Sequence, residues 1–189
     1  MKNFRFVNVL DTEATCYEDG IFPEPEMQEV IEFGITTIDL DSRSIVRTIS
    51  IPVKPGMSSV SEFCTKLTGW TQAKLERQGV SFAAALQRLS EKHGALNRLL
   101  VTDSNGDMEL IETECRRLGL ESPFGQERQN VATLFALLTR QKRNLSLKEM
   151  LAHFGLDFIG TPHRAGDDSY NIARLFLRLL EAADLTPGE

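Results

Sequence analysis

The sequence has no excess of positive charge and few cysteines. Its 189 residues carry 21 Lys and Arg against 27 Asp and Glu, a net charge of −6. Proteins that bind nucleic acid by charge alone are basic, so this balance argues against a simple binding module. It leaves room for an enzyme whose acidic site is neutralised by metal ions. The 3 cysteines, Cys16, Cys64 and Cys115, form no Cys-x-x-Cys pair, which argues against a disulfide framework and a thiolate zinc site.

Long apolar runs are also missing. Charges at Lys2, Arg5 and Asp11 interrupt the N-terminus, so it lacks the apolar region of a signal peptide. No segment is long and apolar enough to span a bilayer, and no internal repeat or linker divides the chain. We therefore expect one soluble, cytoplasmic domain over residues 1–189, without a membrane partner. Its core is expected in about 6–180, ahead of a short flexible tail.

Hydrophobic periodicity and turn residues predict a mixed α/β domain in which most strands precede the helices. The first three predicted strands are joined by short loops and are expected to be antiparallel, with Gly34 as a candidate bulge. The predicted strands are residues 6–10, 29–40, 45–53 and 96–102. The predicted helices are residues 59–68, 81–93, 107–118, 130–140, 145–153 and 168–183.

Two carboxylates stand at the end of the first predicted strand. Side chains of a strand alternate between faces, so Asp11 and Glu13 point to one side and Thr12 to the other. Two carboxylates in a core repel each other and are costly to desolvate unless a cation lies between them. Oxygen-only ligands favour Mg²⁺ or Mn²⁺. Alternatively, both acids lie on a solvated loop just after the strand.

Two further acids open predicted helices. Asp107 lies at the start of the apolar face of its helix, where it is either a helix cap or a metal ligand. Asp168 is the one acid on the apolar face of the last helix. Its neighbour Asp167 is the alternative ligand, but it would point toward solvent, about 100° away around the helix.

A histidine precedes the last of these acids. His163 lies five residues before Asp168, in a loop that Pro162 and Gly166 are expected to keep non-helical. Because histidine titrates near neutral pH, its place beside a metal-bound carboxylate suits a general base. The other histidines, His93 and His153, end predicted helices, where the helix dipole explains them without chemistry.

Together, these acids and His163 resemble the DEDD superfamily of metal-dependent 3′–5′ exonucleases, in the branch with a histidine in its third motif. Further segments are similar to the subgroup that includes the histone-mRNA 3′ exonuclease. These segments are Gln28–Gly34, Pro52–Pro55 followed by Ser61–Gly69, Gly155–Leu156 and Asp168–Ala173. The similarity runs from about Phe6 to Leu180, and the joint order and spacing of the motifs make it specific.

The resemblance implies a ribonuclease-H-like fold, with a mixed sheet of about five strands flanked by helices. It also implies two Mg²⁺ or Mn²⁺ ions held by Asp11, Glu13, Asp107 and Asp168, with Glu13 touching both. In such a site one ion activates the attacking water and the other stabilises the leaving 3′ oxygen. His163 would accept the proton of the water.

A binding surface for the terminal nucleotide follows from the same resemblance. The nucleotide would bind against the backbone of Glu13, Ala14 and Thr15, close to His163. Phe63 would stack on its base, a contact typically worth ~1–3 kcal/mol.

One position departs from the subgroup. Many members carry an aromatic residue four positions before the mid-chain acid, where this sequence has Asp103. An acid cannot stack on a base and would repel a phosphate, but it is a second candidate for the metal ligand. Trp70 either supplies the missing ring for the nucleotide or belongs to the core.

The leading hypothesis is a metal-dependent 3′–5′ exonuclease that releases nucleoside 5′-monophosphates from single-stranded 3′ ends, with RNA favoured over DNA by the subgroup resemblance. Alternatives with the same chemistry are a DNA proofreading or end-trimming exonuclease and an oligoribonuclease acting on very short RNAs. A non-catalytic nucleic-acid-binding or polymerase-partner module is disfavoured, because an acidic site without metal ions repels phosphate.

Overall fold

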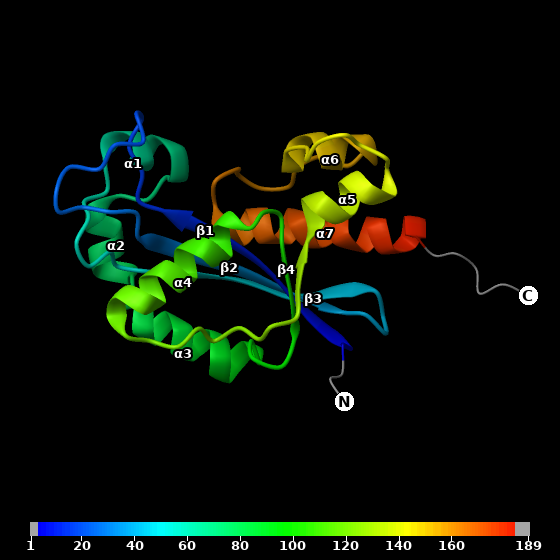
Figure 1. The fold of residues 1–189 in the computed structure, drawn as a ribbon, viewed down its shortest axis with the longest axis horizontal. Helices are drawn as coiled ribbons and strands as arrows, with labels where there is room; N and C mark the ends of the chain where they lie inside the picture. Colours follow the sequence, from blue (N-terminus) through cyan, green and yellow to red (C-terminus); the bar gives the residue numbers. More distant parts are fainter. Residues whose placement is uncertain (1–3, 184–189) are drawn as a thin grey trace, which may run out of the picture.

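A computed structural model describes residues 4–183 of the chain (Figure 1). Its strands form one five-stranded sheet in the order β3-β2-β1-β4-β5. The strands are β1 (Phe6–Ala14), β2 (Val30–Asp39), β3 (Ser44–Pro52), β4 (Leu99–Thr102) and β5 (Arg128–Asn130). The helices are α1 (Glu62–Thr68), α2 (Gln72–Gln78), α3 (Phe82–His93), α4 (Gly106–Leu118), α5 (Val131–Leu138), α6 (Leu147–His153) and α7 (Ala165–Ala183).

The sheet is mixed, as the sequence predicts. β1 pairs with β2 and β2 with β3 in antiparallel fashion, which confirms the expected meander. β4 joins the other edge of β1 in parallel, and β5 runs parallel to β4. The parallel pairing places the carboxyl ends of β1 and β4 at the same edge of the sheet, where the loops after both strands meet.

Helices cover both faces of the sheet (Figure 1). Leu10 of β1 packs in a core cluster with residues of α3 and α4, such as Leu89 and Ile111. Val7 and Val9 point to the opposite face and pack with residues of α5, α6 and α7. Even-numbered residues of β1 thus meet α3 and α4, and odd-numbered residues meet α7. This alternation decides which helix each acid of β1 can reach.

Gly34 is not a bulge. It lies in regular register opposite Asp11 in β1 and Ser50 in β3, and the irregularities lie at Glu13/Ala14 and at Thr37/Ile38. A Cβ atom at Gly34 would lie 1.7 Å from the carbonyl oxygen of Ala165. The missing side chain therefore lets the first turn of α7 rest directly on the sheet, next to the acids of β1.

Other element boundaries also differ from the predictions. α7 begins at Ala165, so Gly166 is helical, and the strand predicted from residue 96 begins at Leu99. Neither α2 nor β5 was predicted. α2 is short and buries only Leu75, while β5 consists of the polar residues Arg-Gln-Asn, which show no apolar alternation.

Two predictions concern the ends and the environment of the chain. The tail predicted at Thr186–Glu189 lies outside the described residues. Among the described helices, none combines the length and the apolar character that crossing a membrane requires.

Candidate active site

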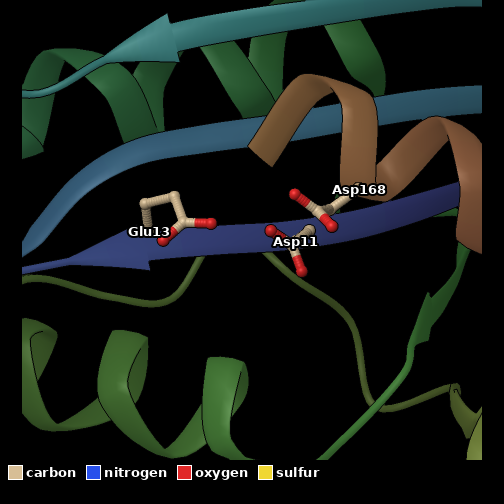
Figure 2. Close-up of side chains that lie close together, drawn as sticks. All are labelled: Asp11, Glu13 and Asp168. Carbon is tan, nitrogen blue, oxygen red and sulfur yellow. The ribbon is translucent and has the colours of Figure 1, made fainter. Parts of the chain in front are cut away.

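Three carboxylates converge on the face of the sheet that α7 covers. Asp11 and Glu13 stand on β1, and Asp168 reaches them from the first turn of α7 (Figure 2). Each offers an oxygen atom, and these atoms lie within 4.8 Å of one another. The predicted common side of Asp11 and Glu13 is therefore confirmed, and the solvated-loop alternative is wrong, because both residues lie within β1.

Buried contacts hold the start of α7 against these acids. The carboxylate of Glu32, which is 2% exposed, accepts hydrogen bonds from the backbone N–H of Ala165 at 3.2 Å and from Nε1 of Trp70 at 2.8 Å. Its other oxygen accepts from the hydroxyl of Ser50. Glu32 thus ties α7 to β3 and to the segment after α1.

Asp107 approaches from the opposite face of β1. Its Oδ1 accepts hydrogen bonds from the backbone N–H of Thr12 at 2.9 Å and from the Thr12 hydroxyl at 2.7 Å. The cap position of α4 is Asn105, whose side chain makes no capping hydrogen bond. Asp107 is therefore turned toward β1, which favours the ligand interpretation over the helix-cap interpretation.

A second group of acids shares one member with the first. Oxygen atoms of Asp11, Asp103 and Asp107 also lie within 4.8 Å of one another. The carboxylate common to both groups is Asp11. The expectation that Glu13 touches both ions stays a prediction. Glu13 lies two residues further along β1, beyond the group that α4 completes. Asp103 joins the second group from the loop after β4, as the alternative in the sequence allowed.

The electrostatics of the site favour a cation. Burial raises the pKa of Glu13 to about 8, of Asp168 to about 7 and of Asp107 to about 6. Burial also raises the pKa of Asp11 well above its ordinary value, and the charges of Asp107 and Asp168 raise it further. Carboxylates that resist ionisation together are stabilised by a divalent ion between them, and an all-oxygen set suits Mg²⁺ or Mn²⁺.

His163 lies on the wall of the same pocket. The pocket has a volume of about 770 Å³, and its lining includes Asp11, Glu13, Asp107, Asp168 and the exposed His163. His163 has a φ of 62°, a left-handed conformation that is unusual for a residue with a side chain. The structure thus brings the predicted histidine and all four predicted acids to one pocket.

The loop that carries His163 is fastened to α7. Oδ2 of Asp167 accepts a hydrogen bond from the backbone N–H of Thr161 at 2.8 Å. The buried Asn171 donates to the carbonyl oxygen of Ile159 at 2.8 Å and accepts from its N–H at 3.0 Å. Asp167 belongs to neither acid group. Its helical position suggested that it points into solvent, but its carboxylate bonds the loop instead. It holds the backbone that positions the histidine.

Sequence reasoning missed the supporting roles of Glu32, Asp167 and Asn171. Glu32 had a usable signal, because an acid inside the apolar run Val30–Phe33 must find partners when buried. Asn171 and Asp167 had none. Both are ordinary polar residues of a helix until the loop folds back on them.

The residues predicted to bind the terminal nucleotide differ in how accessible they are. Ala14 ends β1, and its carbonyl oxygen accepts a hydrogen bond from the thiol of Cys64 at 3.4 Å. Thr15 is buried. Its backbone N–H donates to the carbonyl oxygen of Glu29 at 2.8 Å, and its hydroxyl donates to the carbonyl oxygen of Met27 at 3.2 Å. These groups of Thr15 fix the loop after β1.

The two aromatic candidates differ in exposure. Phe63 is 36% exposed on α1 and lines a smaller hollow with Tyr17, Glu18 and others. Trp70 is 6% exposed, and the guanidinium of Arg164 lies 4.9 Å from the centroid of its ring. Trp70 belongs to the core, and its ring is not available to a base.

A central strand with two acids, an acid on a helix at each face and a histidine loop define a class. They are the features of metal-dependent nucleases with the ribonuclease-H-like fold. The profile of the exonuclease family of RNase T type matches residues 8–176. The chain belongs to this family, and the resemblance seen in its motifs is confirmed.

Comparisons with individual proteins agree. The rat 3′-5′ exoribonuclease 1 is 31% identical over 188 residues, which cover 94% of this chain and 54% of the relative. The chain thus spans about half the length of the curated relatives it matches. The nuclease domain of 3′hExo, a DEDDh family member bound to rAMP, has a TM-score of 0.85 and 29% identity, over 95% of this chain and 94% of that one. A 3′-exonuclease with the histone mRNA stem-loop has a TM-score of 0.85 and 28% identity, over 96% of this chain and 65% of that one.

Proposed function

We propose that residues 6–180 form a single metal-dependent 3′–5′ exonuclease domain. It hydrolyses single-stranded nucleic acid from the 3′ end, RNA in preference to DNA, and releases nucleoside 5′-monophosphates. The observation that carries the proposal is the pair of acid groups that share Asp11 in the pocket lined by His163.

The acids divide into two sets of ligands. Asp11, Glu13 and Asp168 would hold one Mg²⁺ or Mn²⁺ ion, and Asp11 and Asp107 would hold a second. When bound, such ions lower the pKa of water and stabilise negative charge on the leaving 3′ oxygen. Thr12 keeps the carboxylate of Asp107 oriented through its two hydrogen bonds.

His163 supplies the proton transfer. Its imidazole is exposed to the pocket, and a ring nitrogen accepts the proton of the attacking water. The preceding loop donates a hydrogen bond to Asp167 and accepts one from Asn171, which restrains the backbone that carries His163, so less order has to be gained when the substrate binds.

The preference for RNA is supported by the relatives. One similar structure is described as bound to rAMP and another as recognising the 3′ end of a histone mRNA stem-loop. The terminal nucleotide binds at the end of β1, near Ala14 and Thr15, with its base against Phe63. The exposed face of Phe63 supports that contact.

The first experiment uses one single-stranded sequence made as RNA and as DNA, labelled at the 5′ end. Purified protein is incubated with each strand in Mg²⁺, Mn²⁺ or EDTA. We expect a ladder that shortens from the 3′ end, absent in EDTA, with faster loss of RNA. Degradation of neither strand with either metal would falsify the catalytic proposal, and faster loss of DNA would replace the substrate class.

A further inference from the structure

An exposed basic segment begins at the wall of the active-site pocket. Residues 140–148 include most of the connection from α5 to α6 and the first two residues of α6. They contain the cations Arg140, Lys142, Arg143 and Lys148 without a single acid. All four are exposed. In a chain with a net charge of −6, this local reversal of sign stands apart from the average composition.

The segment is continuous with the pocket. Ser146, Leu147 and Lys148, at the start of α6, are among the residues that line it. Lys148 is the one Lys or Arg side chain in that lining of the described structure. From there the chain leads back through Arg143 and Lys142 to Arg140, just after α5, and in Figure 1 the connection from α5 to α6 extends away from the end of β1. The cations therefore form a path that starts where the reacting end of a substrate would lie.

Most of these cations are free to bind an anion. Arg143 pairs with Glu149 at 3.0 Å, in an exposed ion pair. Arg140, Lys142 and Lys148 form no ion pair with any residue of 4–183. Exposed cations that gain nothing from a protein partner keep their full affinity for phosphate.

The opposite rim of the site carries the opposite charge. The loop after β1, residues 16–28, has Glu18, Asp19, Glu24 and Glu26 at its surface and no Lys or Arg, while Glu29 at its end is buried and paired with Arg117. In Figure 1 this loop, beside α1, and the connection from α5 to α6 lie on opposite sides of the end of β1. A polyanion held at the end of β1 is repelled on the first side and attracted on the second.

We infer that the basic segment Arg140–Lys148 binds the phosphate backbone of the strand on the 5′ side of the scissile bond. This inference rests on the proposed function, because it takes the 3′ end to lie in the acidic pocket. No aromatic residue lies between Leu137 and Glu149, so the surface offers charge without a ring for base stacking. Its substrate class is a single strand several nucleotides long, bound without regard to sequence.

The test removes two exposed cations whose side chains form no ion pair among residues 4–183. Arg140→Ala combined with Lys142→Ala lowers the charge without touching the acids, His163 or the pocket lining. The matched control is Arg88→Ala combined with Lys92→Ala, which removes two exposed cations from α3 on the other face of the sheet. Both variants change the net charge equally.

Binding of a 5′-labelled oligoribonucleotide of about 12 nucleotides is followed by fluorescence anisotropy in Ca²⁺. Salt is varied from about 50 to 200 mM. We expect the Arg140/Lys142 variant to bind about tenfold more weakly at the lowest salt. The slope of log affinity against log salt should fall in magnitude by about 1.4, or about 0.7 for each lost phosphate contact. The Arg88/Lys92 variant should match the wild type in both.

Turnover in Mg²⁺ separates this inference from the catalytic proposal. For the long substrate, the Arg140/Lys142 variant should raise KM and keep kcat, with a much smaller change for a dinucleotide. Wild-type affinity and salt slope in this variant, or equal losses in the control, would reject the proposed binding surface even if the wild type degrades RNA normally. A wild type that binds as described but degrades nothing would support the surface and reject the catalytic proposal. Absence of both binding and degradation would reject both.

Discussion

The two acid groups that share Asp11 are positioned by different means. The group with Glu13 and Asp168 depends on the approach of α7 to the sheet, which buried and distant contacts set. The group with Asp103 and Asp107 depends on the short connection from β4 to α4 and on two hydrogen bonds to Thr12. The first is a product of packing between layers, and the second is mostly a product of a local turn.

Gly34 and Gly106 show the difference most directly. A Cβ atom at Gly34 would collide with the backbone of Ala165, whereas one at Gly106 would meet only the hydroxyl of Ser104, at 3.5 Å. The α7 side of the site has no space to spare, and the α4 side has some. A substitution that displaces α7 should therefore shift Asp168 and the loop of His163 together.

Removing the α7 ligand should have the largest effect. We expect Asp168→Ala to abolish nearly all metal-dependent turnover while the domain stays folded, because the first acid group loses the member that α7 supplies. The measurement is release of nucleotide from 5′-labelled RNA, with circular dichroism to establish folding. Full activity of the folded variant would reject Asp168 as a ligand.

Removing the histidine should come second. His163→Ala is expected to lower turnover by about 10²–10⁴-fold, the usual contribution of a general base. Nucleotide binding should be largely retained, since the acids that hold the metal are untouched. Single-turnover rates and anisotropy measure the two quantities. Turnover equal to that of the wild type would make His163 an ordinary loop residue.

Crowding the α7 side should have an intermediate effect. Gly34→Ala forces α7 away from β2, and we expect a loss of about 1–3 kcal/mol in the free energy of unfolding. Turnover should fall by about 10–100-fold as Asp168 and His163 shift together. Denaturant titration and initial rates measure these effects. Gly106→Ala is the matched control and should change both quantities little, so equal losses in the two variants would contradict the contrast between the sides.

Loosening the α4 side should have the smallest effect. Thr12→Val removes the hydroxyl that bonds Asp107 but keeps the backbone hydrogen bond. We expect about a tenfold loss of turnover, visible as a higher Mg²⁺ requirement, and about 1 kcal/mol of stability. A Mg²⁺ titration of initial rates tests this, with Thr12→Ser as the control that restores the hydroxyl. An unchanged Mg²⁺ dependence in Thr12→Val would show that Asp107 needs no help from β1.

Much of the site could be predicted before any coordinates. The side shared by Asp11 and Glu13 follows from strand alternation, and the inward direction of Asp107 and Asp168 follows from helical periodicity. The meander of the first three strands follows from short loops. These features depend on residues a few positions apart, so local geometry determines them.

Three features came only from the tertiary structure. Asp11, not Glu13, is common to the two acid groups. Trp70 is a core residue whose ring N–H donates a hydrogen bond to Glu32. Asp167 holds the loop of His163 through a hydrogen bond. Each depends on the distance between elements far apart in the chain. Periodicity gives the direction of a side chain relative to its own helix or strand. The packing of layers, set here by contacts such as Gly34 against Ala165, decides what that side chain meets.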